Sequence, residues 1–110
     1  CEGGNNMVMC EYMACGKTVI ASDMTGHADV ITSENAIPLT CYRPYLYEGY
    51  GKGVWFEPDV EEVIESLELA YSMRHQLHRK GMVAAEDMGR LSWSQAARQF
   101  HEIAQRLKQV

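Results

Sequence analysis

The hydrophobic positions at the start of the chain fall in short runs separated by turn-forming residues. The run at residues 7–14 is followed by Gly16, a pattern that predicts a short buried helix with a glycine at its C-terminal cap. The runs at residues 18–21 and 36–39 are too short for helices, so the first predicts a buried strand and the second another strand, which Pro38 limits to a sheet edge or a strand end. Between these strands, residues 27–32 are expected to form another short turn of helix.

The second half of the chain places its apolar residues at helical spacing instead. Asp59, followed by acidic residues, marks the start of one helix, and a second apolar stripe, which includes Gly81, follows it. Ser92 and Gln95 form a capping box that begins a third, amphipathic helix at residues 92–110. We expect Trp93 to anchor this last helix in a hydrophobic core. Its apolar stripe consists of Trp93, Ala96, Ala97, Phe100, Ile103 and Leu107.

The order of these elements predicts an α/β chain that is rich in helix. Two short parallel strands, with helices between and after them, are typical of the last part of a Rossmann-like sheet. Residues 42–56 are rich in tyrosine and glycine without a clear period, so we expect a long loop there. Two parallel strands alone leave sheet faces uncovered. We therefore expect marginal stability, or self-association of two copies through an exposed strand edge.

Composition and charge narrow the class of protein. With 110 residues the chain forms at most one small domain, and its 46% hydrophobic content is ordinary for a globular protein. A formal net charge of −5 argues against nucleic acid as a partner, because that ligand needs a basic surface. No apolar run is long enough for a transmembrane segment. The cysteines match neither a zinc site nor a disulfide scaffold, so we expect reduced thiols at Cys1, Cys10, Cys15 and Cys41, with Cys10 and Cys15 in apolar surroundings.

The strongest chemical signal lies in the first sixteen residues. The Gly-Gly-Asn-Asn loop at residues 3–6 is flexible, and its asparagines are suited to capping a helix. The unpaired N–H groups at a helix start favour phosphate. Glu2 before the loop and Glu11 on the helix suit vicinal hydroxyls, because an ionised carboxylate accepts hydrogen bonds. Phosphate with hydroxyls on both sides describes a nucleotide-sugar.

These residues also resemble a known family. Residues 2–22, Glu-Gly-Gly-Asn-Asn-Met-Val-Met-Cys-Glu-Tyr-Met-Ala-Cys-Gly-Lys-Thr-Val-Ile-Ala-Ser, are similar to the donor-binding signature of GT-B glycosyltransferases, above all the retaining family 4. Residues 25–31 resemble the family's Gly-Gly-x-x-Glu-hydrophobic segment, and Leu-Ser-Trp at 91–93 resembles the Phe-Ser-Trp that opens its last helix. One departure is that eight residues, not seven, separate Glu2 from Glu11, which a one-residue bulge would accommodate.

The resemblance implies that residues 1–110 are part of the C-terminal, donor-binding domain of a longer glycosyltransferase of the hexosyltransferase type. It implies that Glu11 holds the ribose, that Glu2 contacts the donor sugar, and that the loop amides hold the diphosphate. No metal or other cofactor is implied. The donor-binding residues are then Glu2, Gly3, Gly4, Asn5, Asn6, Met7 and Glu11.

The partners implied by the resemblance are a nucleotide-sugar donor and the N-terminal part of the parent enzyme. The family places its acceptor site and a basic catalytic pair upstream of the motif, so no catalytic residue is expected here and the chain alone should be inactive. The parent is expected to be cytoplasmic or peripheral to a membrane.

Two other functions remain open at this point. One is a nucleotide-sugar epimerase of the same fold, which would need acid and base groups that the sequence does not display. The other is a non-catalytic helical interaction module, in which the glycine-rich loop is a plain turn and Glu11 is an acid in the first turn of a helix.

Overall fold

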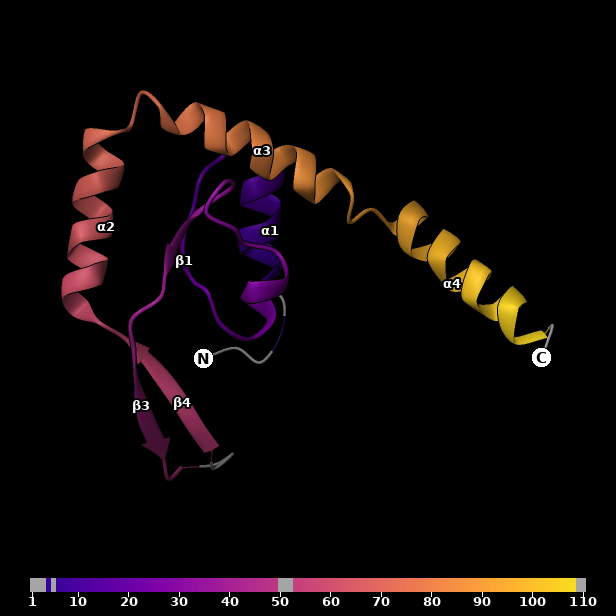
Figure 1. The fold of residues 1–110 in the computed structure, drawn as a ribbon, viewed down its shortest axis with the longest axis horizontal. Helices are drawn as coiled ribbons and strands as arrows, with labels where there is room; N and C mark the ends of the chain where they lie inside the picture. Colours follow the sequence, from indigo (N-terminus) through magenta and orange to yellow (C-terminus); the bar gives the residue numbers. More distant parts are fainter. Residues whose placement is uncertain (1–3, 5, 50–52, 109–110) are drawn as a thin grey trace.

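The computed structural model describes Gly4, residues 6–49 and residues 53–108, and it shows a mixed α/β chain (Figure 1). Within these residues there are two separate two-stranded sheets, the parallel pair β1 (Ile20–Ser22) and β2 (Ile37–Leu39) and the antiparallel pair of β3 and β4, together with four α-helices. The expected α/β class, with two short parallel strands, is therefore confirmed. The antiparallel pair was not expected.

The first helix, α1 (Met7–Ala14), has the bounds that the sequence predicted. It begins at Asn6, whose side-chain Oδ1 accepts a hydrogen bond from the Met9 amide at 3.0 Å. It ends at Gly16, which has a φ of 73° and whose amide donates to the Met13 carbonyl at 2.9 Å. Local sequence signals therefore fix both ends of α1.

The parallel pair β1–β2 forms directly after α1, with Ile20 opposite Ile37 and Ser22 opposite Leu39. The connection between the strands contains a short 3-10 helix, η1 (Thr25–Asp29), close to where a helical turn was expected. Because α1 precedes β1 through a tight turn, the start of the helix lies near the carboxyl end of the strand. This arrangement positions the candidate site.

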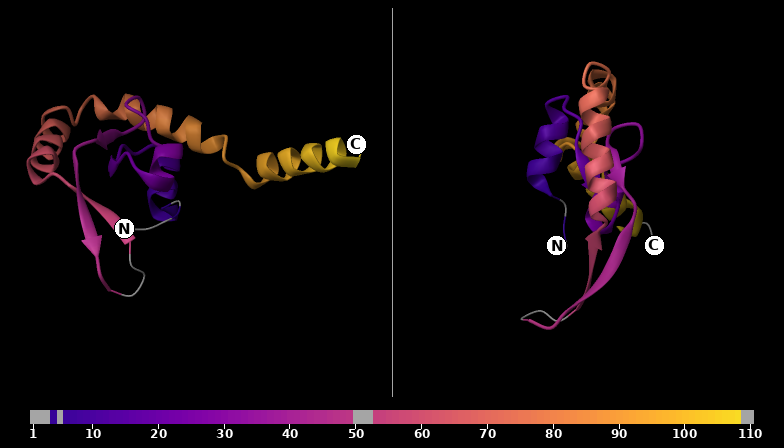
Figure 2. Two further views of the ribbon diagram at one scale, coloured as in Figure 1. Left: turned by 60° about the horizontal axis from the view of Figure 1, so that its bottom comes forward. Right: turned by 90° about the vertical axis from the view of Figure 1, so that its left-hand side faces the viewer.

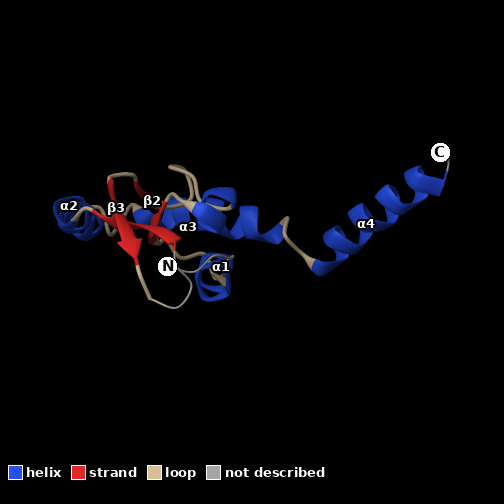
Figure 3. Cartoon of the chain, turned by 90° about the horizontal axis from the view of Figure 1, so that it is seen from below, coloured by secondary structure: helices blue, strands red, loops and turns tan. Residues whose placement is uncertain are grey.

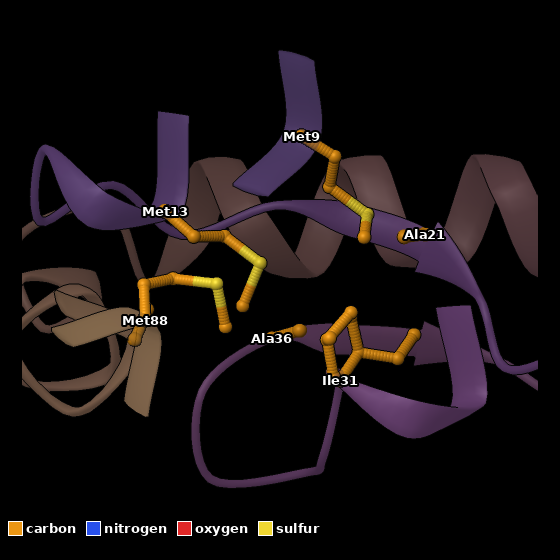
Figure 4. Close-up of a cluster of buried hydrophobic side chains, with 8 residues drawn as sticks. Met9, Met13, Ala21, Ile31, Ala36 and Met88 are labelled. Atoms are coloured by element: carbon orange, nitrogen blue, oxygen red, sulfur yellow. The ribbon is translucent and has the colours of Figure 1, made fainter. Parts of the chain in front are cut away.

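A small hydrophobic core holds these elements together. Met9 and Met13 of α1 contact the loop residues Ile31 and Ala36 and the α3 residue Met88 (Figure 4). Helix α3 (Leu77–Gly89) lies across α1, as Figure 1 shows. The methionines suit this role because their flexible side chains fill irregular spaces between a helix and a loop.

Main-chain contact joins α3 to the turn after α1. A Cβ atom built on Gly81 would lie 2.0 Å from the carbonyl oxygen of Gly16, so only glycine fits at position 81. Next to this contact, the Thr18 hydroxyl donates a hydrogen bond to the Leu77 carbonyl at 2.9 Å. The sequence had placed residue 81 on an apolar stripe without indicating this contact.

A buried asparagine ties the loop before β2 to α3. Asn35 is 1% exposed. Its Nδ2 donates to the Val30 carbonyl at 3.0 Å and to Asp87 Oδ2 at 2.8 Å, and its Oδ1 accepts from the Thr32 amide at 2.7 Å. All the polar atoms of this side chain are therefore satisfied, as burial requires.

The long loop expected at residues 42–56 is a wrong prediction. Most of it forms the antiparallel hairpin of β3 (Tyr42–Tyr47) and β4 (Gly53–Pro58), which projects from the rest of the chain (Figure 1). Tyr47 and Trp55 stack with their ring centroids 4.6 Å apart. The hairpin has apolar residues on both of its faces, so it lacks the alternation that normally reveals a strand.

Two further helices complete the described chain. Helix α2 (Val60–Ser72) follows the hairpin and is capped by Asp59, as predicted. Helix α4 (Trp93–Lys108) begins after Ser92, whose hydroxyl accepts a hydrogen bond from the Gln95 amide at 3.3 Å. Figure 2 shows that α4 extends away from the other elements. The expectation that Trp93 is a core anchor is therefore wrong, because its side chain is 90% exposed.

Candidate functional site

A groove of about 440 Å³ opens between α1 and β1. Its walls come from the start of α1, the length of β1, η1 and the end of β2. The residues that line it are Asn6, Val8, Met9, Tyr12, Val19, Ile20, Ala21, Ser22, His27 and Leu39. In open α/β sheets, ligands bind at the carboxyl ends of parallel strands, and this groove occupies that position.

The start of α1 supplies hydrogen-bond donors at one end of the groove. The Asn6 side chain accepts a hydrogen bond from the Met9 amide, and the Asn6 carbonyl accepts one from the Cys10 amide at 3.0 Å. Within the described residues, the amides of Met7 and Val8 have no acceptor. These are the donors that a helix start offers to an anionic group.

The other polar groups of the groove come from the strand ends. Ser22 ends β1, and His27 lies in η1 directly beyond it. Tyr12 of α1 adds a phenol to the opposite wall. Among the described residues that line the groove, none is Asp, Glu, Lys or Arg. The groove therefore suits a ligand whose charge is met by main-chain amides and whose remaining surface is partly apolar.

Tyr42 closes the strand-end side of this region. Its hydroxyl donates a hydrogen bond to the Leu39 carbonyl at the end of β2. Burial is the main cause that raises the pKa of Tyr42, and the nearby carboxylates of Asp23 and Glu62 raise it further. The phenol therefore stays protonated at neutral pH and keeps donating this hydrogen bond.

The residues predicted to bind the nucleotide-sugar donor differ in where they lie relative to the groove. Asn6 lines the groove, whereas Met7 is exposed beside it. Gly4 is exposed, and an added Cβ there would meet no atom within 4 Å. Glu2, Gly3 and Asn5 lie outside the described residues.

Glu11 lies on the exposed side of α1 and does not line the groove. The first turn of α1 contains no acidic residue, so the alternative in which Glu11 serves the helix start does not hold. Glu11 follows Met7 by one helical turn, which puts both on the same side of α1. A ligand would have to extend from the groove around the helix start to reach this carboxylate, and its role stays a prediction.

The described cysteines divide into two environments, and Cys1 lies outside the described residues. Cys10 is partly buried against the core, and burial, followed by the charge of Glu11, raises the pKa of its thiol. Cys15 is exposed, so the expectation that it lies in apolar surroundings is wrong. Cys41 is also an exposed free thiol. The raised pKa of Cys10 makes it a poor nucleophile at neutral pH.

Sequence reasoning missed Tyr12 and Ser22 as groove residues. Ser22 had a usable signal, because it is the polar residue that ends a buried strand of a parallel pair. Tyr12 had none, since its position on the groove side depends on how α1 packs on β1. In the described part of the chain, no three His, Cys, Asp or Glu residues group as metal ligands would, and no helix has the length and apolar character needed to cross a bilayer.

Comparison with known proteins identifies no relative of this chain. No protein-family model, curated protein or solved structure matches the chain.

Proposed function

We propose that this chain forms part of the donor site of a GT-B glycosyltransferase resembling retaining family 4. The parent enzyme would move a sugar from a nucleotide-sugar to an acceptor hydroxyl. One observation carries the proposal: the groove joins the start of α1 to the carboxyl ends of β1 and β2, directly after the Gly-Gly-Asn-Asn loop. The motif predicted to bind phosphate therefore coincides with a groove at whose end lie amides that have no acceptor among the described residues.

The diphosphate of the donor would lie at the start of α1, where the Met7 and Val8 amides are available. The apolar side chains of Val8 and Leu39 would border the less polar part of the ligand. Glu11 would accept hydrogen bonds from the ribose hydroxyls beyond the groove, and Glu2 from the sugar. Amides fixed in this way stabilise the charge that develops on a departing diphosphate.

The proposal assigns chemistry to the parent enzyme rather than to these residues alone. The acceptor site and the basic pair that the family uses would come from other parts of the enzyme. The described residues would bind and orient the donor without a metal ion. We therefore expect the chain by itself to bind nucleoside diphosphates weakly and to transfer no sugar.

Calorimetric titration of the chain with UDP, GDP and ADP tests this proposal. We expect at least one of these to bind, and Glu11→Gln to weaken binding by about 1.5–3 kcal/mol, the range for a hydrogen bond to a charged group. Glu34→Gln is the matched control, because Glu34 is also exposed but lies away from the groove. In NMR spectra, the amide shifts on binding should concentrate at Met7, Val8 and Ser22.

Either of two results would contradict the proposal. One is that none of the nucleotides binds. The other is that binding occurs but is indifferent to Glu11→Gln and shifts amides remote from α1.

A second candidate function is a non-catalytic helical interaction module. The exposed apolar side of α4 favours it, because Trp93 and Phe100 are 90% and 76% exposed. The two functions are compatible in one parent protein, and only the first one predicts nucleotide binding at α1.

A further inference from the structure

The described chain is far more extended than a folded domain of its length. Its Cα radius of gyration is 17.2 Å, whereas a compact domain of 110 residues has about 13 Å. Its accessible surface is 8559 Å², roughly 2,400 Å² more than the surface of a compact protein of this mass. A standard protein interface covers about 800 Å² on each partner, so the excess is large enough for a stable dimer.

Much of the exposed apolar surface lies on α4. Its apolar positions repeat at three- and four-residue intervals, so they form one stripe along the helix. None of the residues of α4 is buried. The large side chains on this stripe are Trp93, Phe100, Ile103 and Leu107.

Helix α2 carries a second stripe that faces away from its own packing contact. The side of α2 that contains the buried residue Ser66 also carries Glu62, which binds the segment after β2. The exposed stripe lies on another side of the helix, and Leu67 and Tyr71 on it are 56% and 71% exposed. The members of this stripe are Val60, Ile64, Leu67 and Tyr71.

The two helices carry opposite charge. Helix α2 contains no basic residue, and its glutamates Glu61, Glu65 and Glu68 are three and four positions apart along the side next to its apolar stripe. Helix α4 carries Arg98, Arg106 and Lys108 and the single acid Glu102. Helical geometry places Glu102, and Arg98 four residues before it, on the side opposite the apolar stripe, whereas Arg106 and Lys108 lie closer to the stripe on either side of it. An acidic amphipathic helix and a basic one are complementary both in their apolar stripes and in their charge.

These helices do not pair within one molecule. Figure 3 shows α2 at one end of the long axis and α4 at the other, with α3 between them. The longest extent of the described chain is 54 Å, so one copy cannot bring them together without rearranging α3. A second copy turned by a two-fold axis perpendicular to this direction would bring each α4 to the end of the molecule where the other copy's α2 lies. Such an arrangement is closed and buries both stripes twice.

We propose that this chain forms a reciprocal homodimer in which α4 of each copy packs its apolar stripe against α2 of the other. The contact combines apolar burial with attraction between the acidic and basic sides of the two helices. This contact is separate from the groove at α1, so a test of the dimer does not depend on whether the chain binds nucleotides.

Analytical ultracentrifugation of the chain over a concentration series tests the dimer. We expect a species of twice the chain's mass, and Leu67→Asp or Phe100→Asp to raise the dissociation constant by about tenfold or more. Met82→Asp is the matched control, because Met82 is also an exposed apolar residue on a helix but belongs to neither stripe. Circular dichroism should show that all three variants keep their helix content.

Mixing the variants tests which helices pair. A mixture of the Leu67→Asp and Phe100→Asp chains keeps one intact α2 and one intact α4, so we expect it to recover association that neither variant shows alone. The charge reversals E61K/E65K/E68K and R106E/K108E should each weaken the dimer, and their combination in one chain should restore it.

Several outcomes would overturn the proposal. A monomer at all concentrations does so, whether or not α4 then binds vesicles of anionic phospholipid. A dimer that persists in both the Leu67→Asp and the Phe100→Asp variants would also overturn the proposal, because another surface, such as the edge of β1–β2, would then hold the two copies together. A dimer that Phe100→Asp disrupts and Leu67→Asp does not would show that α4 pairs with α4.

Discussion

At the scale of single residues, Gly81 is the position with the least room. Its Cα faces the Gly16 carbonyl, and no side chain separates the two backbones. We expect Gly81→Ala to lower the free energy of unfolding by about 1–3 kcal/mol, because a core that is already in contact must shift to admit a methyl group. Urea denaturation followed by circular dichroism measures this difference.

The control for this substitution lies on the same helix. A Cβ built on Gly89 would meet no atom within 4 Å, and Gly89 is exposed. Gly89→Ala should therefore leave stability unchanged or raise it slightly, since alanine favours helix. Equal losses for the two variants would show that general helix effects, rather than the contact with Gly16, determine the cost.

Single residues also show where sequence reasoning succeeds and where it fails. Asn6 and Gly16 were predicted as the ends of α1 because each acts on atoms within a few residues of itself. Asn35 and Gly81 were not singled out, because their partners Asp87 and Gly16 lie more than fifty positions away in the sequence. A single sequence contains no signal for such distant partners.

At the scale of secondary-structure elements, one carboxylate fastens α2 to the parallel pair. Glu62 Oε1 accepts hydrogen bonds from the Thr40 amide at 2.8 Å and the Thr40 hydroxyl at 3.0 Å, and its Oε2 accepts from the Cys41 amide at 2.8 Å. These bonds, first those from Thr40 and then those from Cys41, hold the pKa of Glu62 below its usual value. The contact therefore depends on Glu62 being ionised.

This dependence predicts how stability responds to acid. The pKa is lower in the folded chain than in the unfolded one, so the stabilisation is complete above the unfolded pKa and is lost as the pH falls through the folded pKa. We expect the native chain to be more stable than Glu62→Gln at neutral pH, and the difference to shrink between about pH 5 and 3. Thermal melts across this range measure it.

Glu34→Gln provides the comparison for this experiment, because Glu34 is an exposed acid that belongs to neither α2 nor α4. It should change the melting temperature little and keep the acid response of the native chain. A constant gap between the native chain and Glu62→Gln at every pH would contradict the assignment.

The secondary-structure elements also differed in how well the sequence predicted them. Helices α1, α2, α3 and α4 were found from apolar spacing and capping residues, because these patterns are local. The hairpin was missed because Tyr45 and Leu46, neighbours on opposite faces of β3, are both apolar and exposed. The groove was only partly foreseen, since Asn6 belongs to the motif whereas Tyr12 depends on helix packing.

At the scale of the whole molecule, the packing contacts are concentrated in one region. The core cluster draws its buried residues from α1, β1, the loop before β2, and α3. The hairpin and α4 contribute no residue to it. Local stability should follow this distribution, because segments with few buried contacts open more readily.

Hydrogen exchange followed by NMR checks this expectation. Amides in α1, β1 and α3 should exchange slowest, and those of β3 and β4 much faster. The amides of α4 should exchange fast in dilute solution and more slowly at concentrations where the proposed dimer forms. Hairpin amides that exchange as slowly as those of α1 would contradict this view of where the stability lies.

The charge distribution that separates α2 from α4 has one more consequence. Acidic groups gather at one end of a 54 Å molecule and basic groups at the other, so the chain carries a permanent electric dipole moment along its longest axis. Neighbouring molecules at low ionic strength then attract one another when they lie side by side in opposite directions. Added salt screens this attraction over roughly 10 Å at 0.1 M, so the proposed dimer should dissociate more readily in ultracentrifugation as salt is added.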